Sequence, residues 1–584
     1  MYRYKYMSKM LKQKMKSIVK QFLSYRYHHP RRLFSTNVVT GHPRRLFSTN
    51  EVTGSSTSDG DNDNYRYPHA FPTTSTIKEF RNAWDYLPDG ARHQIDNKSN
   101  TNTTLAGRIM SKRDMSNSLT FLDLVGGNEG MDKVQIIADT KYLKDTNTLS
   151  PDKIQRGDII GVKGFPGKSN RGELSILSEE LVLLAPCNAP MPDTARNKMT
   201  DHDLRFRKRY LDFLTNSNSR NIILTRIRTL QYIRKYLEDK GFLEVETPIL
   251  SVAAGGAIAK PFKTNSIAFG KDMDLFLRIA PELYLKKMII AGFERVFEIG
   301  KVFRNEGVDP THNPEFTTCE FYIAYADYND LMHMTEDMIR GLVYEITGGS
   351  YILEYTINDD NGDGNNNVKD NDDNSGKGKK TISIDFEQPF ERISLIEGIE
   401  ARGGFTIPKP IDKSNVELNT FLEKKILELN LKLPTVKTTA KLLDKLTKHY
   451  LEDNIMERPT FIIDHPEVMS PLAKDHRSKP GMTERFELFI CGKELCNAYT
   501  ELNDPELQRE RFENQALDKS KGDNEAHGID EDFISALNHG LPPTAGWGMG
   551  IDRLVMFLTN VKHIREVIAF PTVRPEEGII EEES

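Results

Sequence analysis

The sequence has few cysteines and no long apolar run, and each absence excludes a class of protein. Only four of its 584 residues are cysteine, too few for a disulfide framework in a chain of this length. No apolar stretch approaches the roughly 18 residues that span a bilayer, so we expect no membrane integration. At roughly 100 to 200 residues per domain, the length predicts three or four structural segments.

Common metal and phosphate motifs are also missing. Cys491 and Cys496 form a lone C-x4-C without a second pair or His partners, which favours two thiols beside a turn over a zinc site. Gly161 and Gly167 enclose five residues, whereas the phosphate-binding loop G-x4-GK[ST] requires four. The run GWGMG at 546–550 is not the GxGxxG of a dinucleotide-binding fold.

The first fifty residues lack Asp and Glu but contain twelve Lys or Arg. Apolar residues recur there at helical spacing, namely Met7, Leu11, Met15, Ile18 and Phe22. This composition is typical of a mitochondrial import presequence, and the alternatives are a nucleic-acid-binding arm or a solvated charged tail. We predict a presequence over residues 1–54 and a location in the mitochondrial matrix.

Residues 29–41 and 42–54 are two copies of one 13-residue unit, HPRRLFSTNVVTG and HPRRLFSTNEVTG. A single duplication is too short for a solenoid, which needs at least three repeats. RRLFS resembles a matrix-processing site, so we predict cleavage within residues 31–50. Subtracting the twelve positive charges of the first fifty residues from the net charge of −6 leaves −18 on residues 51–584. Nucleic-acid binding by that part needs a local basic surface.

Composition divides the rest of the chain into segments. Residues 55–103 predict a polar linker with a short helical segment. Residues 104–190 hold five short apolar runs between turn signals, which predict a small barrel. A larger domain follows over 191–584, and within it residues 358–380 contain one apolar residue in 23. That stretch predicts a disordered surface insertion without a catalytic role.

The larger domain begins with a predicted amphipathic helix that ends at Lys240 and Gly241, glycine being the usual residue just past a helix end. Its apolar stripe consists of Ile223, Ile227, Leu230, Ile233 and Leu237. We expect a strand at FLEVETP, residues 242–248, which Pro248 closes.

Residues 295–304 and 316–325 predict neighbouring strands of a buried sheet, joined by a charged loop. Side chains alternate along a strand, so Phe316, Glu320 and Tyr322 should share one face. A buried carboxylate between two aromatic rings costs several kcal/mol unless a cation satisfies it. Glu320 therefore needs a positive partner.

The loop between these strands reads NEGVDPTHNP. Arg304 precedes it and His312 lies at its far side. Arg and His at a strand end can hold an anionic phosphate, because a guanidinium binds two oxygens at once. The alternative is an Arg–Glu pair that only braces the hairpin.

A second predicted hairpin covers residues 484–502 and turns at Cys491-Gly492-Lys493. Its return strand places three side chains on one face: Asn497, Tyr499 and Glu501. Glu494 has the opposite parity, so bringing it to the face of Glu487 requires a bulge or a place in the turn. Two carboxylates beside a phosphate suit Mg²⁺, which binds through one or two carboxylates plus substrate oxygens. Plain surface charge is the alternative.

Together these elements resemble the class II aminoacyl-tRNA synthetases over roughly residues 65–575, apart from the insertion. GFLEVETPIL resembles the family's first motif, a dimer-interface element; FRNEG through EFTTCEFYIAYADY resembles the second, and GWGMGIDRL the third. The strings RIAPELYLKKMIIAGFERVFEIG, MSPLAKDHR and NAYTELNDP are similar to the lysyl-tRNA synthetase branch. The resemblance implies an α+β fold, in which a five-stranded OB barrel that binds the tRNA anticodon precedes an antiparallel catalytic sheet of six to eight strands flanked by helices.

The resemblance also implies an ATP site with Mg²⁺. Arg304 corresponds to the α-phosphate ligand, His312 to the γ-phosphate ligand, and Phe316 and Arg553 to the two faces of adenine. Arg304 and Arg553 are the implied catalytic residues, and Glu487 and Glu494 match the Mg²⁺ ligands. The full nucleotide set is Arg304, Glu306, His312, Asn313, Phe316, Glu487, Glu494, Gly550 and Arg553.

For the amino acid, Glu282 and Glu320 match the carboxylates that read the α- and ε-ammonium groups of lysine. The rest of the implied pocket is Gly256, Ala280, Tyr322, Asn497, Tyr499 and Glu501. The implied anticodon contacts in the barrel are Arg113, Phe121 and Gln135, with Phe121 alternatively a core residue. The implied function is ATP-dependent ligation of lysine to tRNA(Lys) by a homodimer.

Other functions fit the residues less well. An aspartyl- or asparaginyl-tRNA synthetase needs a cation in the side-chain pocket, where Glu320 and Glu501 stand. A protein-modifying paralogue would lack the barrel. A non-catalytic tRNA-binding paralogue would have lost Arg304, Glu494 or Arg553, and all three are present. A cytosolic synthetase remains an alternative to the mitochondrial one.

Overall fold

The computed structural model describes residues 67–91, 102–128, 131–144, 148–192, 199, 201–253, 255–257, 259–267, 270–358, 379–520 and 528–574. The predicted presequence and its cleavage site lie outside these residues, as does the insertion apart from its first and last residues. Among the described residues, no helix is long and apolar enough to cross a membrane.

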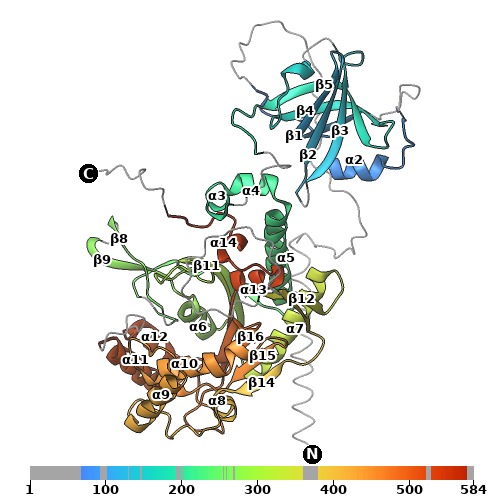
Figure 1. Ribbon diagram of the computed structural model, residues 1–584. Coiled ribbons are helices and arrows are strands. Elements are labelled where there is room, and N and C mark those ends of the chain that lie inside the picture. Colours follow the sequence, from blue (N-terminus) through green and yellow to red (C-terminus); the bar gives the residue numbers. More distant parts are fainter. Residues whose placement is uncertain are drawn as a thin grey trace, which may run out of the picture. The chain divides into compact units, whose positions relative to one another are not determined.

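A closed five-stranded barrel forms from the first group of strands, in the order β1-β2-β3-β5-β4 (Figure 1). Its strands are β1 (Thr103–Ser116), β2 (Leu119–Gly126), β3 (Asp132–Asp139), β4 (Ile159–Lys168) and β5 (Leu174–Ala185). Alternate residues such as Leu122 and Leu124 fill the interior. Helix α2 (Ile77–Trp84) begins with a capping box at Thr76 and adds Phe80 to that core. The five predicted runs coincide with these strands, so the barrel prediction is confirmed.

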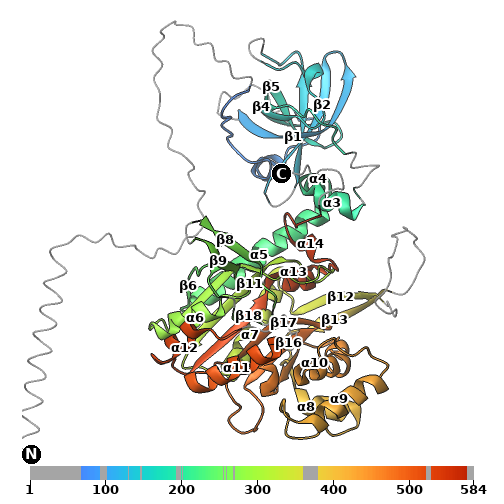
Figure 2. The same cartoon turned by 90° about the vertical axis from the view of Figure 1, so that its left-hand side faces the viewer.

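An eight-stranded sheet is the centre of the larger domain, in the order β14-β15-β16-β17-β18-β11-β10-β6 (Figure 2). The strands are β6 (Leu243–Glu244), β10 (Arg295–Phe303), β11 (Glu315–Ala324), β14 (Glu391–Ser394), β15 (Thr460–Ile463), β16 (Arg485–Ile490), β17 (Lys493–Thr500) and β18 (Thr544–Gly550). The six central strands are antiparallel as predicted, whereas β14 and β6 pair in parallel at the two edges.

One face of the sheet is covered by three helices: α5 (Ser217–Asp239), α7 (Tyr328–Thr347) and α13 (Ile551–Thr559). Phe321 and Trp547 stack at 4.7 Å between ring centroids in this core. Helix α5 ends at Asp239 with Lys240 as its C-cap, and Gly241 follows with φ of +80°, so the predicted end at Lys240 and Gly241 is confirmed to within one residue. The apolar stripe differs: Ile233 and Leu237 are buried, but Ile227 is 45% exposed.

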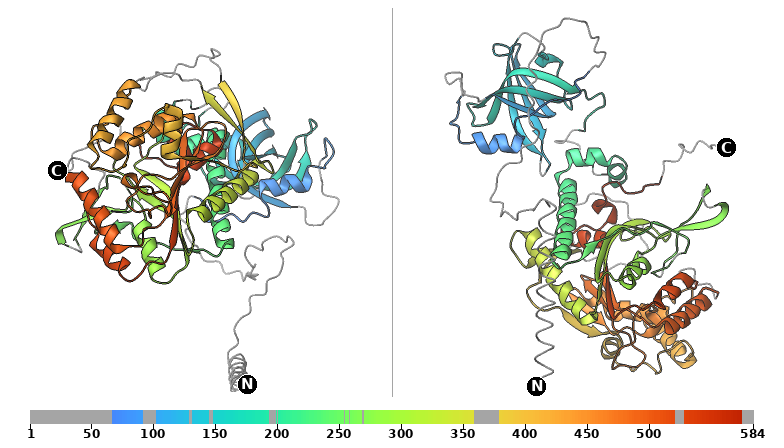
Figure 3. Two further views of the ribbon diagram at one scale, coloured as in Figure 1. Left: turned by 90° about the horizontal axis from the view of Figure 1, so that it is seen from below. Right: turned by 180° about the vertical axis from the view of Figure 1, so that it is seen from behind.

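The other elements pack around this centre. Helices α8 (Leu395–Gly403), α9 (Val416–Glu428) and α10 (Thr439–Tyr450) share a core with β15 and β16 and cluster together in both views of Figure 3. Helices α6 (Glu282–Ile290) and α12 (Glu531–Leu537) pack on the face opposite α5. The remaining helices are α3 (His202–Arg207), α4 (Arg209–Thr215), α11 (Pro505–Ser520) and α14 (Ile564–Val567), with single 3₁₀ turns at Pro151–Lys153, Glu452–Asn454 and Glu467–Met469.

Two predictions need correction, one of a strand and one of the insertion. The strand expected over 242–248 is only β6, although the amide of Val245 still donates to Phe297. The insertion predicted over 358–380 is shorter at both ends, because Asn358 pairs with Lys379 in an antiparallel ladder. That ladder joins β12 (Ile352–Asn358) to β13 (Lys379–Asp385). A small separate sheet contains β7 (Leu250–Ser251), β8 (Lys263–Ser266) and β9 (Gly270–Leu277).

Candidate active site

A cavity of about 360 Å³ lies over the central strands, on the face opposite α5. Sixteen of the seventeen residues predicted for the ATP and lysine pockets line it, and they come from segments far apart in the sequence. Only Glu501 among the predicted pocket residues is absent from the lining. The predicted residues at the cavity are Gly256, Ala280, Glu282, Arg304, Glu306, His312, Asn313, Phe316, Glu320, Tyr322, Glu487, Glu494, Asn497, Tyr499, Gly550 and Arg553.

The alternation of β11 divides its side chains between core and cavity. Cys319 and Phe321 pack in the core with the helices, whereas Phe316, Glu320 and Tyr322 line the cavity. The predicted common face of these three residues is therefore confirmed. A glycine is required beside them, because a Cβ on Gly546 would lie 2.5 Å from the Tyr322 ring.

The open end of the cavity is formed by Arg304, His312, Glu494 and Arg553, whose side chains come from both predicted hairpins and from α13. Arg553 donates from Nη1 to Glu494 and from Nη2 to the Nε2 of His312, at 3.1 Å each. His312 Nδ1 then donates to Asp309 at 2.8 Å. Glu494, Arg553, His312 and Asp309 thus form one chain of hydrogen bonds at the far side of the loop.

Arg304 is held by its backbone and surrounded by acidic groups. Its amide donates to the carbonyl of Pro314 at 2.9 Å, which closes the loop. Its guanidinium carbon lies 5.1 Å from the ring centroid of Phe316, within reach of a cation–π contact. Burial lowers its pKa, which Glu306 and Glu494 partly offset. Within the described residues, its buried Nε has no hydrogen-bond partner, so the guanidinium can accept an anion.

Asp552 fixes the start of α13. It accepts from the amide of Thr317 at 2.6 Å and from Arg226 on α5 at 2.7 Å. Arg226 also donates to the hydroxyl of Thr317 at 2.8 Å. The carboxylate therefore joins α5, β11 and α13, and the adjacent Arg553 is placed over the cavity by this junction.

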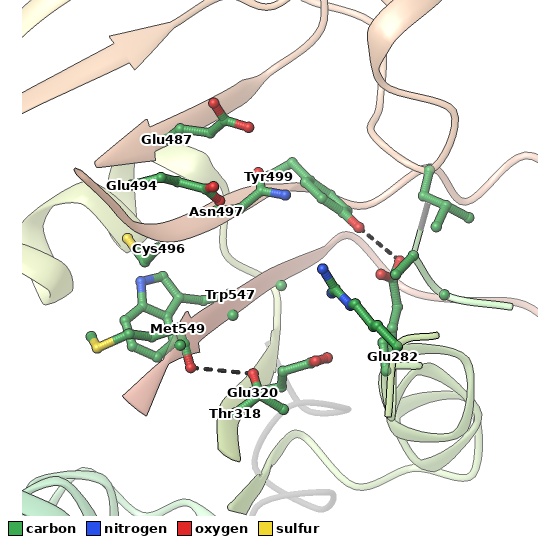
Figure 4. Close-up of a pocket in the computed structure, with 18 of the residues that line it drawn as sticks. Glu282, Thr318, Glu320, Glu487, Glu494, Cys496, Asn497, Tyr499, Trp547 and Met549 are labelled. Atoms are coloured by element: carbon green, nitrogen blue, oxygen red, sulfur yellow. Dashed lines mark hydrogen bonds between the residues drawn. The ribbon is translucent and has the colours of Figure 1, made fainter. Parts of the chain in front are cut away.

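A β-bulge brings Glu494 to the face of Glu487. Leu488 pairs with Cys496 and Phe489 pairs with Glu494, so Leu495 is the extra residue. This is one of the two arrangements that the parity conflict predicted. Figure 4 shows both carboxylates on neighbouring strands of the cavity wall. Burial alone would raise the pKa of Glu487, but Arg485 and His465 beside it lower the pKa to about 2.

The closed end of the cavity consists of Glu282, Glu320, Tyr322 and Tyr499, all largely shielded from solvent. Tyr499 donates to Glu282 at 2.8 Å (Figure 4), and Tyr322 donates to Glu320 at 3.4 Å. Gly256 lies against this end with φ of +88°, and a Cβ there would lie 3.2 Å from that of Glu282. Burial, reinforced by Glu282, raises the pKa of Glu320 to about 8. Among the described residues no basic side chain forms an ion pair with this carboxyl group, and its hydrogen bond comes from Tyr322.

Glu501 differs from its prediction as a cavity-lining residue. It is fully buried behind Gly546, where a Cβ would lie 1.9 Å from its Oε1. Its Oε2 contacts the Nζ of Lys286, which also donates to Glu282 at 2.6 Å. The sequence reasoning missed Lys286, although its i, i+4 spacing from Glu282 was a usable signal. Arg485, two residues before Glu487 on the same strand face, was also missed.

The three barrel residues predicted for tRNA lie on neighbouring strands. Arg113 pairs with Phe121 between β1 and β2, and Asp123 pairs with Gln135 between β2 and β3. Phe121 is half-buried on the outer face, opposite the core residues Leu122 and Leu124, so the core alternative for it is wrong. Arg113 bonds Asp123 at 3.3 Å. Gln135 is buried and donates to Glu173 at 2.9 Å.

The chain is similar to known synthetases over most of its length. Residues 201–574 match the family described as tRNA synthetases class II (D, K and N). The chain is 44% identical to the lysine--tRNA ligase cla4 of Cladosporium cladosporioides, over 88% of this chain and 82% of the relative. It is 42% identical to the probable cytoplasmic lysine--tRNA ligase of Encephalitozoon cuniculi, over 87% and 94%. The lysine--tRNA ligase of Thermotoga sp. (strain RQ2) is 41% identical over 87% and 92%. The chain therefore belongs to the class II tRNA synthetases and, within them, to the lysine--tRNA ligases.

Proposed function

We propose that this chain ligates L-lysine to the 3′ end of tRNA(Lys) in two steps. The lysine carboxylate attacks the α-phosphorus of ATP, the bond to the bridging oxygen breaks, and pyrophosphate leaves lysyl-adenylate behind. The 3′-terminal ribose hydroxyl of the tRNA then attacks the lysyl carbonyl, and AMP leaves. The observation that carries this proposal is a single cavity with cationic side chains at its open end and buried carboxylates at its closed end.

We assign the triphosphate and adenine to the open end. Arg304 contacts the α-phosphate there and His312 the γ-phosphate, while adenine lies between Phe316 and Arg553. Support comes from the unpaired Nε of Arg304 and from the position of Arg553 above the cavity. No side-chain nucleophile is required, because orientation of the two substrates and neutralisation of the developing charge supply most of the acceleration.

Glu487 and Glu494 are the proposed ligands of Mg²⁺. The bulge at Leu495 gives the two carboxylates one face, which fits an ion that needs one or two carboxylates plus substrate oxygens. Within the described residues, no three His, Cys, Asp or Glu side chains are grouped to hold a metal ion alone. On this proposal, nucleotide oxygens and water complete the coordination. When bound, Mg²⁺ neutralises phosphate charge and orients the leaving group.

Lysine is assigned to the closed end, with its α-ammonium at Glu282 and its ε-ammonium at Glu320. Gly256, Ala280, Tyr322, Asn497 and Tyr499 surround it, and Glu501 acts from behind Gly546. Selectivity for lysine should come mainly from charge pairing and less from the shape of the pocket, because one methylene group changes the binding free energy by only about 1 to 3 kcal/mol. Ornithine should therefore be rejected far less strongly than leucine.

Amino-acid-dependent ATP–pyrophosphate exchange with the full chain and all twenty amino acids tests this assignment. We expect strong exchange with lysine alone. Strong exchange with another amino acid would refute the substrate, and no exchange with any would favour the non-catalytic tRNA-binding alternative. A ligand-bound structure in which Glu320 bonds only to protein groups would also refute it.

The barrel is the proposed anticodon-binding domain. Arg113 and Phe121 are neighbours on its outer face, where Phe121 is half-buried, and an aromatic ring with one accessible face suits stacking on a base. Of the three assignments, Gln135 has the least structural support, because its side-chain amide is already hydrogen-bonded to Glu173 and Ser175. Filter binding of the anticodon stem-loop of tRNA(Lys) would measure the contribution of each residue.

Mitochondrial targeting is the proposed role of residues 1–54, supported by their lack of acidic residues and the helical spacing of their apolar ones. A fluorescent fusion of the full chain should enter mitochondria and one without residues 1–54 should not. N-terminal sequencing of the mitochondrial protein should begin within or after 31–50. Met1 at the start of the mitochondrial protein would refute cleavage, and a cytosolic full-length fusion would favour the cytosolic alternative.

A homodimer is the proposed assembly. The first family motif carries exposed apolar side chains at Leu243, Ile249 and Leu250, and Ile227 on α5 is exposed as well. Exposed apolar side chains concentrated in one motif support a partner surface there. Light scattering should give twice the 66.7 kDa of the chain, or twice the mass of the processed form.

A further inference from the structure

Lys286 is a buried ammonium group next to the proposed lysine site. It lies on α6 one turn after Glu282 and is 0% exposed. Its Nζ donates to Glu282 at 2.6 Å and contacts Glu501, and it lies 5.7 Å from the ring centroids of Tyr499 and Phe533. A buried charge is retained only when partners satisfy it. Burial alone would lower the pKa of Lys286, but Glu282 and Glu501 raise it above the ordinary value.

The charges around this group can be counted. Three carboxylates, Glu282, Glu320 and Glu501, face the closed end or lie directly behind it. Lys286 is the cation that contacts two of them. Arg278 and Glu298, the other charged pair near Glu320, bond each other and cancel. Arg304 is not counted, because on the proposed function it pairs with the negative phosphate and carboxylate groups of the substrates.

Bound lysine balances the remaining carboxylates, a step that rests on the proposed function. Lysine brings two ammonium groups, so three carboxylates face three ammonium groups when it is bound. Without Lys286, one of the buried carboxylates would be left unmatched, which is strongly unfavourable in a site closed to water. A neutral amino acid leaves the same deficit, because it supplies only one ammonium group.

We propose that Lys286 is a specificity-determining positioning residue. Its ammonium group neutralises one of the three carboxylates, so the remaining negative charge of the pocket matches an amino acid with two ammonium groups. It acts through Glu282 and Glu501 and does not touch the reacting atoms. It also holds Glu282 in the orientation in which Tyr499 bonds the same oxygen. A role in packing alone would depend on the shape of the side chain and not on its charge.

Lys286→Met separates these roles, because it preserves most of the length and removes the charge. In lysine-dependent ATP–pyrophosphate exchange, the KM for lysine should rise at least about 30-fold, the usual result of removing one partner of a buried charge pair. The KM for ATP should stay within about twofold of wild type. Lys287→Met is the matched control, since Lys287 is the next residue and pairs with Asp532 outside the cavity. An unchanged lysine KM in Lys286→Met would overturn the proposal.

The double variant Lys286→Met/Glu501→Gln tests the charge count directly. It restores two carboxylates for two ammonium groups, so its KM for lysine should be at least about tenfold lower than that of Lys286→Met, a coupling of the size seen between contacting groups. A double variant that is worse than Lys286→Met would show additive losses and overturn the proposal.

Folding is followed by the melting temperature of each variant. If Lys286→Met is insoluble, the double variant should still fold, because its charges match; failure of both would assign Lys286 to packing alone. Wild-type exchange with lysine is measured in parallel. Its absence would refute the proposed function itself, an outcome distinct from normal wild-type exchange with an insensitive Lys286 variant.

Discussion

The open and closed ends of the cavity hold their charges in different ways. At the open end, the side chains of His312, Glu494 and Arg553 are 46%, 40% and 31% exposed and bond one another. At the closed end, Glu282, Lys286 and Glu501 form a network with almost no exposure. Groups in contact with water can exchange partners when a phosphate arrives, whereas a buried network is set before the substrate binds. Under the proposed function, the open end is an adaptable nucleotide clamp and the closed end is a rigid recognition site for the lysine side chain.

The largest effect should come from Arg304, the cation of the open end with the least satisfied side chain. Arg304→Ala should lower lysine-dependent ATP–pyrophosphate exchange about 10³-fold, because a donor aimed at developing charge is worth about that much. Arg509→Ala, which removes a surface pair with Glu531, is the control. Near-wild-type exchange by Arg304→Ala would contradict the clamp.

Glu320 tests the closed end. Glu320→Gln keeps the shape and removes the charge, so the KM for lysine should rise about 100-fold, as expected when one partner of a buried charge pair is lost. The affinity for ATP, measured by titration calorimetry without lysine, should not change. An equal loss of ATP affinity would mean that the two ends act as one unit and that the contrast drawn above is wrong.

The third-largest effect should be a pH dependence of lysine binding, which tests the closed end of the cavity. Glu320, with a pKa of about 8 in the free protein, is protonated at neutral pH and must lose that proton to pair with an ammonium group. The Kd for lysine should therefore fall about tenfold between pH 6 and 7 and level off near pH 8. Calorimetry in buffers of different ionisation enthalpy should register about one proton released per lysine at pH 6.5. A flat profile in wild type would refute this role, and Glu320→Gln should be flat in any case.

The smallest effect should come from the barrel, which lies outside both ends. Phe121→Ala should raise the KM for tRNA about tenfold, since stacking on one base is worth about 1 to 3 kcal/mol, and should leave exchange without tRNA unchanged. Tyr86→Ala removes an exposed aromatic ring near α2 and serves as the control. Equal effects of the two variants on tRNA would remove Phe121 from the proposed anticodon surface.

Strand alternation accounts for what could be predicted from sequence. The parity of Phe316, Glu320 and Tyr322 placed them together because a strand has only two faces. The same rule placed Glu494 on the opposite face from the other polar residues of its hairpin, and so predicted a bulge or a place in the turn. Helix α5 was harder, because it carries apolar residues on two sides and periodicity alone does not say which side packs inward. Ile227 was therefore assigned to the wrong side.

The contacts that the sequence concealed are those between distant segments. Lys286 and Glu501 lie 215 positions apart in the numbering, and nothing local to either signals a buried ion pair. A lysine on a helix is ordinarily solvent-exposed, and only the packing of α6 against β10, β11 and α12 removes that possibility. The length of β6 was overestimated for a similar reason: β6 pairs with β10 only at Val296 and Phe297, and the amide of Thr247 then donates to the side chain of Glu298 instead of the backbone of β10.

The junction at Asp552 has a consequence for biosynthesis. Arg226 and Asp552 are separated by 326 positions, so the ribosome releases one partner long after the other. Chains fold in part as they emerge, yet no nascent chain can complete this junction until nearly all of it has been made. A truncated product of this gene can therefore contain the barrel, the first hairpin and Arg304 and still lack Arg553. Such a product should not bind ATP stably.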